Sequence, residues 1–349
     1  MDTMPGKPPT RVLGRTGVQV SRSGLGTMVL GVWGNRDRAE CNRIINGAID
    51  AGINLVDTAD MYGQGENEEI VGEALRGRRD DVFLATKFHN PMGDPDSGDA
   101  RNRRGNSRRW INTAIDDSLR RLGVDHIDLY QIHRPDPLTP IDETVAALDD
   151  LVRAGKIRYW GTSTFPAEEL VEARWAAERR GVNGPHTEQP PYSIFCRHIE
   201  RDVLPVCERH GIGVIVWSPL SGGWLTGKYG HGRGVPSGSR AETNPDHFDG
   251  QNDAKADAID ALRKVANEAG LSLTQLALAW AAEHPAISCV LLGPRTEEQL
   301  AELLGAAEIE LDDDALDAID AIVPPGVDLN PADAGWIPPG LAPAPRRRR

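Results

Sequence analysis

Short apolar runs alternate along the chain with longer segments in which apolar residues recur every three or four positions. The first pattern is typical of buried parallel strands, and the second of helices with one buried face. The predicted strands are residues 24–27, 53–56, 82–86, 127–132, 156–161, 187–189, 213–217 and 288–292. The predicted helices are residues 38–51, 66–76, 107–122, 141–154, 167–180, 199–210 and 273–283.

Uninterrupted alternation of strand and helix over eight strands predicts an α/β fold of the (β/α)8 TIM-barrel type. An open dinucleotide-binding sheet would carry a G-x-G-x-x-G turn after its first strand, and residues 24–29 lack the third glycine. A β-hairpin at residues 11–20 precedes the predicted barrel. Glycines that follow helical runs mark helix ends at Gly52, Gly123, Gly155, Gly181 and Gly211.

The pattern divides the chain into one long domain with two ends. Residues 1–9 are predicted to be disordered, residues 10–325 to form a single barrel domain, and residues 326–349 to form an extended tail. Two long polar connections, residues 89–106 and 218–252, follow predicted strands. Because long connections in compact domains are usually functional or disordered, we interpret both as substrate and cofactor loops at the rim.

Composition and charge limit the kinds of molecule that the protein is expected to bind. The formal net charge of −13 argues against general nucleic-acid binding, although residues 101–109 and 346–349 are locally basic. The first basic segment is either a solvated loop or a site that attracts an anionic substrate. No apolar run is long enough to cross a bilayer, and the first residues lack the apolar core of a secretory signal, so we expect a cytoplasmic protein with no membrane partner.

Cysteine and histidine positions predict neither disulfides nor a metal site. The four cysteines are scattered and unpaired in spacing, and the nine histidines form no ligand pair of a known zinc type.

Ionisable side chains stand where three predicted strands end. Asp57 and then Tyr62 follow the second strand, Lys87 follows the third and His133 follows the fourth. In a parallel barrel these ends share one rim, where the active site lies. Taken singly, Asp57 could be a helix cap and Tyr62 a core aromatic. Lys87 could be a surface charge, and His133 a loop histidine whose hydrogen bonds are satisfied. Four together favour a catalytic site.

The segments that carry these residues resemble the aldo-keto reductase superfamily. Asp57-Thr58-Ala59 with Tyr62-Gly63, Ala85-Thr86-Lys87, and residues 128–133 match its catalytic segments in order, and the resemblance covers residues 11–323. Residues 159–163, 217–220 and 227–229 are similar to the branch that contains the potassium-channel β subunits and bacterial reductases. Channel-associated members typically lack the catalytic histidine, so His133 favours a working reductase.

The resemblance implies NADPH-dependent reduction of an aldehyde or ketone to an alcohol. Tyr62 would be the general acid, with Lys87 as the cation that makes its proton available. Asp57 would keep Lys87 charged and oriented, and His133 would donate a hydrogen bond to the carbonyl oxygen.

Hydride chemistry without a metal requires an organic cofactor. The resemblance assigns the nicotinamide amide to Ser163 and Gln189, and the ring face to Trp217. It places further cofactor contacts at Thr27, Met28, Asp57, Thr164, Ser218, Pro219, Leu220, Gly222, Lys228, Gly293, Gln299 and Glu302. Arg240 and Arg295 are candidates for the 2′-phosphate, because a guanidinium binds phosphate well, and they predict a preference for NADPH over NADH.

Two other functions stay open at the level of sequence. One is a regulatory or scaffold subunit that binds a nicotinamide cofactor. The other is a keto- or enoyl-reductase acting on a sugar nucleotide, whose diphosphate could meet the basic segment at residues 101–109. The expected partner is a small-molecule carbonyl substrate, and the sequence leaves homo-oligomer formation open.

Overall fold

A computed structural model describes residues 9–93, 100–243 and 251–337 of the chain. The predicted disorder of residues 1–8 and the basic end at residues 346–349 lie outside these ranges, as do parts of both long loops.

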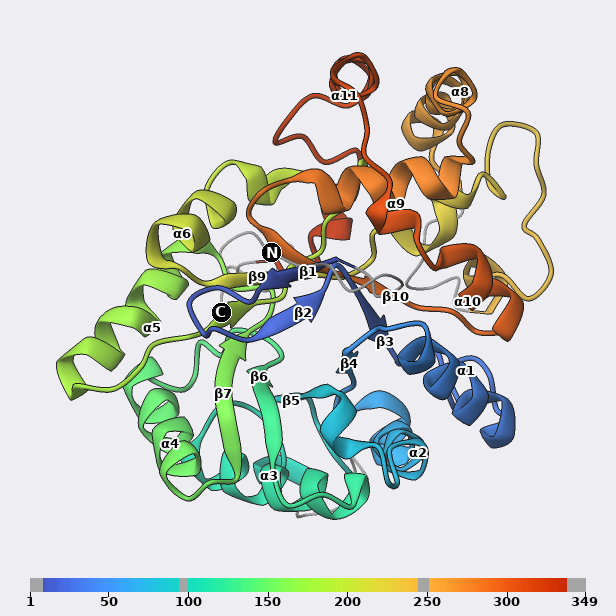
Figure 1. Cartoon of the computed structure of the whole chain (residues 1–349). Coiled ribbons are helices and arrows are strands. Elements are labelled where there is room, and N and C mark those ends of the chain that lie inside the picture. The colour runs from blue at the N-terminus through green and yellow to red at the C-terminus, as the bar shows by residue number, and fades with distance from the viewer. Residues whose placement is uncertain (1–8, 94–99, 244–250, 338–349) are drawn as a thin grey trace.

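Eight parallel strands close into a barrel in the order β10-β3-β4-β5-β6-β7-β8-β9 (Figure 1). They are β3 Ser23–Gly26, β4 Leu55–Asp57, β5 Phe83–Phe88, β6 Ile127–Ile132, β7 Ile157–Thr162, β8 Thr187–Glu188, β9 Gly213–Val216 and β10 Ile287–Leu292. Nearly every residue of these strands is buried, as expected for a sheet whose faces are both covered. The predicted (β/α)8 barrel is confirmed.

Helices surround the barrel. Those that follow strands are α1 Arg38–Asp50, α2 Glu66–Ala74, α3 Arg108–Leu122, α4 Ile141–Arg153, α5 Ala167–Arg180, α6 Val203–His210, α9 Leu273–Glu283 and α10 Glu297–Leu303. All five glycines predicted to end helices have positive φ. Two helices that were not predicted, α8 Asp253–Glu268 and α11 Asp313–Ile322, pack against each other outside the barrel (Figure 1).

One predicted helix is wrong in its extent. Residues 199–210 were expected to be continuous, but the structure has a 3-10 turn, η4 His198–Glu200, and then α6 from Val203. Pro205 explains the break, because its ring would clash with the carbonyl of Arg201 in a continuous α-helix. Proline is tolerated here because it lies in the first turn of α6.

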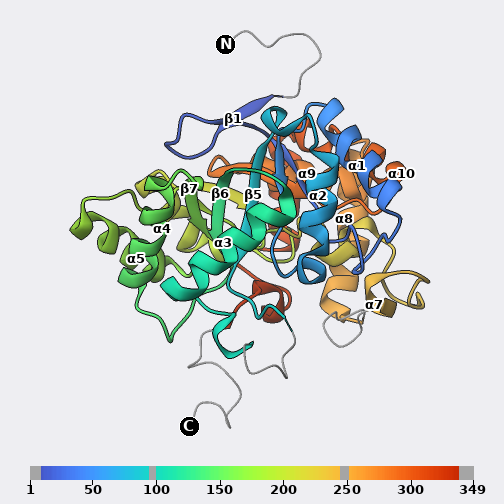
Figure 2. The ribbon, with the colours of Figure 1, turned by 90° about the horizontal axis from the view of Figure 1, so that it is seen from below.

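The hairpin closes one end of the barrel. Strands β1 Thr10–Val12 and β2 Gln19–Ser21 pair antiparallel, as predicted, and Leu13 and Val20 are fully buried. These two side chains pack in the cluster that fills the barrel interior. Figure 2 shows the hairpin at one end of the molecule and α7 Arg240–Thr243 at the other. The hairpin therefore covers the end of the barrel at which the strands begin and leaves open the end at which they terminate.

Hydrogen bonds and an ion pair hold the last described segment against the rest of the protein. The carboxylate of Asp328 accepts hydrogen bonds from the backbone N–H groups of Arg197 at 2.7 Å and His198 at 2.9 Å. Asp333 at η7 Pro331–Ala334 pairs with the buried Lys255 at 2.6 Å. The chain consequently returns to the open end after α11.

No helix in the described ranges is both long enough and apolar enough to cross a membrane.

Candidate active site

Strand register brings the predicted catalytic residues to one end of the barrel. Asp57 is the last residue of β4 and pairs with Ala85, and Lys87 lies two residues further along β5. His133 directly follows β6, whose Gln131 pairs with Lys87. Tyr62 begins the 3-10 turn η1 Tyr62–Gly65 after β4.

The Lys87 ammonium group joins the other residues together. It is 1% exposed, and its Nζ forms an ion pair with Asp57 Oδ1. It also donates to the backbone oxygen of Thr58 at 2.9 Å and to the Tyr62 hydroxyl at 3.4 Å. Burial alone would lower the pKa of Lys87, but Asp57 and Tyr62 raise that pKa by more. The ammonium is therefore charged, and three acceptors satisfy its three donors.

Asp57 is held by two amides as well as by Lys87. Its Oδ2 accepts from Gln189 Nε2 at 2.8 Å and from Gln131 Nε2 at 3.1 Å. A buried carboxylate is costly unless it is paired and hydrogen-bonded, and here both oxygens are engaged. Gln131 was not among the predicted site residues. Its position as a polar residue inside an apolar strand was the available signal.

His133 is a neutral donor in this geometry. Its Nδ1 accepts a hydrogen bond at 3.1 Å from the amide nitrogen of Asn90, a loop residue without any sequence signal that would select it. The proton therefore resides on Nε2. Burial, together with the charges of Arg134 and Lys87, holds the pKa of His133 well below its ordinary value. The imidazole edge faces the Tyr62 ring, with centroids 5.9 Å apart.

The Tyr62 phenol is protonated more firmly than the sequence predicted. Lys87 does act to lower the pKa of Tyr62, but burial is the larger effect and raises that pKa above its ordinary value. Tyr62 is 8% exposed, and the ring of Trp33 lies 5.7 Å from it. Trp33 itself is half exposed and was not predicted, because a lone aromatic in a loop has no periodic signal.

The residues expected to contact the nicotinamide meet at one backbone carbonyl. The oxygen of Gln189 accepts from Ser163 Oγ at 2.7 Å and from Trp217 Nε1 at 3.2 Å. The Gln189 side chain points the other way, toward Asp57. Ser163 and Gln189 are buried, and the indole of Trp217 is partly exposed at the rim.

Backbone strain concentrates beside this group. Thr164, Ser218 and Ser221 have φ values of 60°, 57° and 47°, which are unfavourable for residues with a Cβ, and most of all for β-branched threonine. Gly222 and Gly223 continue the left-handed conformation in the 3-10 segment η5 Ser221–Thr226. Such strain costs about 1–3 kcal/mol per residue and is typical of ligand-binding loops.

Cations gather where this loop meets α10. The pKa of Lys228 is lowered by burial and by the charges of Arg295 and Arg240. Burial also lowers the pKa of Arg240. Arg295 donates from Nη1 to the backbone oxygen of Gly238 at 2.7 Å, which links α10 to the loop that carries Arg240. The structure thus brings together the three cations singled out in the sequence.

The remaining predicted cofactor residues differ from one another in burial and in hydrogen bonding. Thr27 is fully buried, and its hydroxyl donates to the Asp57 carbonyl oxygen at 2.9 Å, so it supports the strand end. The Gln299 amide oxygen accepts from the backbone N–H of Arg295 at 2.9 Å. Glu302 is exposed and makes no hydrogen bond or ion pair within the described ranges. Met28, Pro219, Leu220, Gly222 and Gly293 lie in the connections after β3, β9 and β10.

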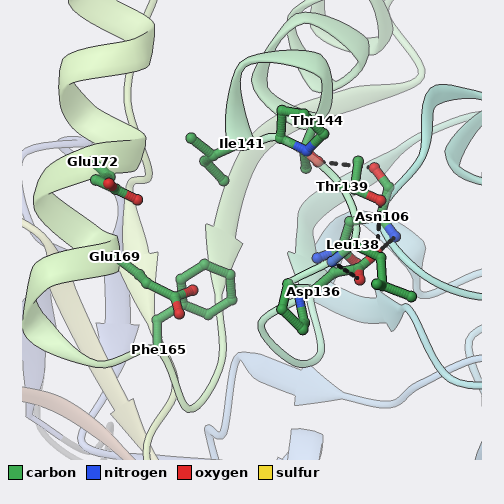
Figure 3. Close-up of a pocket in the computed structure, with 11 residues that line it drawn as sticks. Asn106, Asp136, Leu138, Thr139, Ile141, Thr144, Phe165, Glu169 and Glu172 are labelled. Carbon is green, nitrogen blue, oxygen red and sulfur yellow. Dashed lines mark hydrogen bonds between the residues drawn. The ribbon is translucent and has the colours of Figure 1, made fainter. Parts of the chain in front are cut away.

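A separate hollow lies outside this site. Its volume is about 340 Å³, and Figure 3 shows Glu169 and Glu172 on one side and Ile141 and Thr144 on the other. None of the four predicted catalytic residues lines it. Burial and two neighbouring glutamates raise the pKa of Glu169 to about 7.

The four residues, their order and the barrel that carries them agree with one known family. The sequence profile of the Aldo/keto reductase family matches residues 23–324. The chain belongs to this family. It is therefore an aldo/keto reductase family oxidoreductase, as the resemblance of its catalytic segments implied.

The chain is similar to proteins named as channel subunits and to proteins named as oxidoreductases. The chain is 38% identical over 321 residues to a "Probable voltage-gated potassium channel subunit beta" of Oryza sativa subsp. japonica, covering 89% of this chain and 95% of that protein. It is 39% identical over 332 residues to "Uncharacterized oxidoreductase YrpG" of Bacillus subtilis, covering 93% and 98%. It is 37% identical over 296 residues to "Aldo-keto reductase YhdN" of the same organism, covering 82% and 85%.

Proposed function

We propose that this aldo/keto reductase reduces the carbonyl group of an aldehyde or ketone with NADPH, using Tyr62 as the general acid. The observation that supports this most directly is the Lys87 ammonium, which joins Asp57 to the Tyr62 hydroxyl in a buried site. A purely structural ion pair would not need a protonated phenol at its edge.

Each of the four residues has a separate role in the protonation of a carbonyl oxygen. Tyr62 and the Nε2–H of His133 donate to that oxygen, which polarises the carbonyl group. Tyr62 then gives up its proton, and Lys87 at 3.4 Å stabilises the tyrosinate that is left. Asp57 and its two amide donors keep the ammonium in place.

The rim suits a nicotinamide dinucleotide phosphate. When bound, the reduced nicotinamide supplies the hydride. Ser163, Gln189 and Trp217 would hold the nicotinamide. Hydrogen bonds from Ser163 and Trp217 to the backbone oxygen of Gln189 keep the three together, and the side-chain oxygen of Gln189 accepts no hydrogen bond within the described ranges. Lys228, Arg240 and Arg295 would hold the phosphates, since partly buried cations close together favour an anionic ligand.

Cofactor consumption tests the proposal. Absorbance at the NADPH band is followed with aldehydes, quinones and keto sugars, using wild type, Tyr62→Phe and the control Tyr130→Phe. We expect Tyr62→Phe to lower kcat at least ~100-fold without weakening NADPH binding, since general acid catalysis contributes that much. Tyr130 has a buried hydroxyl with no partner among the described residues, so its substitution should cost little. Wild-type turnover by Tyr62→Phe would show that the acid is another group.

The similarity to channel β subunits supports a second candidate, a regulatory subunit that binds a nicotinamide cofactor. This second candidate predicts tight NADPH binding with no turnover of any carbonyl compound. The same screen therefore distinguishes it from the proposed reductase.

A further inference from the structure

Arg134 lies directly behind His133, and the function proposed above gives it no role. Its guanidinium carbon lies 5.9 Å from the centre of the Trp217 ring, and its Nη1 donates to the backbone oxygen of His133. Its own backbone oxygen accepts from the Asn106 amide at 3.2 Å. The side chain is thus held over the open end of the barrel, between the predicted nicotinamide residues and the acid.

This guanidinium lacks a carboxylate partner. Within the described ranges no carboxylate lies at ion-pair distance from Arg134. By contrast, Arg103 in the loop before α3 pairs with Asp117, and Arg108 at the start of α3 pairs with Asp150. Burial lowers the pKa of Arg134, so this cation is partly stripped of water. An incompletely solvated cation with no counter-ion favours an anionic ligand.

The surrounding charges leave the positive potential of Arg134 uncancelled. Glu188, the carboxyl group that acts to raise the pKa of Arg134, is hydrogen-bonded to Thr162 and to the backbone N–H of Phe165. Burial raises the pKa of Glu188 to about 8, so this carboxyl is largely neutral at pH 7. Asp57 is already neutralised by Lys87.

We propose that Arg134 binds a carboxylate that the substrate carries near its reacting carbonyl group. The preferred substrates would be keto acids and aldehyde acids. A planar carboxylate matches the fork of donors that Nη1 leaves free, and the guanidinium lies beside Tyr62 and Trp217, where a carbonyl compound must sit. This inference rests on the proposed carbonyl reduction.

The test compares an acid with its ester. Phenylglyoxylate and its methyl ester are assayed with wild type, Arg134→Met, Arg134→Lys and the exposed control Arg109→Met, after thermal unfolding has shown that each variant is folded. In Arg134→Met the acid-to-ester ratio of kcat/KM should fall roughly 10–100-fold, the scale of a charged hydrogen bond, mainly through KM of the acid. Arg134→Lys should retain part of the ratio, and Arg109→Met all of it.

Three results would overturn the inference. One is an acid-to-ester ratio that Arg134→Met leaves within twofold of wild type. Another is an equal loss of kcat for both substrates, which would mean that Arg134 acts through Tyr62. The third is a larger fall, in Arg134→Met, of the ratio of kcat/KM for glyceraldehyde 3-phosphate to that for glyceraldehyde. Such a fall would show that Arg134 binds a phosphate instead of a carboxylate.

A binding measurement separates this inference from the proposed function. If wild type reduces neither these two compounds nor any carbonyl compound of the screen described above, carbonyl reduction itself fails. Calorimetric titration of mandelate into the protein with NADP+ then decides the role of Arg134. Mandelate binding at least tenfold weaker in Arg134→Met supports it, and equal affinities refute it.

Discussion

A hydrogen bond of 3.4 Å connects the Lys87 ammonium to the Tyr62 hydroxyl in a buried site, and in the proposed mechanism the two groups act as one unit. We therefore expect Lys87→Met to lower kcat about as severely as Tyr62→Phe, and the double variant to be little worse than either single one. Steady-state kinetics of the three variants with one aldehyde measures this coupling. Losses that multiply in the double variant would show that the two groups act independently.

Glu188 gives the stability of the fold a pH dependence of predictable sign. Burial raises the pKa of Glu188 from 4.5 in the ordinary state to about 8 in the folded chain. Between these values the folded state holds a proton that the unfolded state has lost, so the free energy of unfolding falls as pH rises, by at most about 1.4 kcal/mol per pH unit. Glu188→Gln should flatten this slope between pH 6 and pH 8.

Urea unfolding at several pH values measures this effect. The matched control is Glu268→Gln at the exposed end of α8, whose slope should equal that of wild type. A wild-type slope retained in Glu188→Gln would assign the dependence to other groups.

At the scale of elements, the loop after β9 and the start of α10 form one cation-rich junction, held by Arg295 and the backbone of Gly238. We expect Arg240→Ala and Arg295→Ala each to weaken NADPH binding by roughly 1.5–3 kcal/mol, because in the proposed binding mode each would remove a charged hydrogen bond to the 2′-phosphate. NADH binding should change much less. Titration of both cofactors, with the exposed Arg153→Ala on α4 as a control, checks this. Parallel losses for NADPH and NADH would exclude a 2′-phosphate contact.

At the scale of the whole molecule, the barrel has one end for stability and one for chemistry. Leu13 of the hairpin is fully buried among the interior side chains of the barrel. Leu13→Ala should lower the free energy of unfolding by about 2–5 kcal/mol, as for other buried leucines, and leave kcat at 25 °C near wild type. Denaturation and activity are measured together, with the exposed Val12→Ala as the control. A matching loss of kcat in folded Leu13→Ala would show that the two ends are coupled.

The sequence predicted the barrel well because apolar periodicity depends on burial alone. Strand ends could also be placed, so Asp57, Lys87 and His133 were expected at one rim and lie there. Periodicity gave no access to contacts that depend on loop conformation, such as the hydrogen bond from Asn90 to His133. It also missed the net effect of burial on the pKa of Tyr62, which depends on the depth of the side chain and outweighs the charge of Lys87.

The return of the chain after α11 has a consequence for anyone who shortens this protein. A methyl group added at Gly335 would come within 2.9 Å of the Trp217 ring and 3.2 Å of Thr164 Cγ2, so this glycine lies directly against the proposed cofactor residues. It is eleven residues beyond the family match, which ends at residue 324, and the hairpin with Leu13 precedes the match at residue 23. A version trimmed to the matched segment would thus lose both the floor of the barrel and part of the wall of its site.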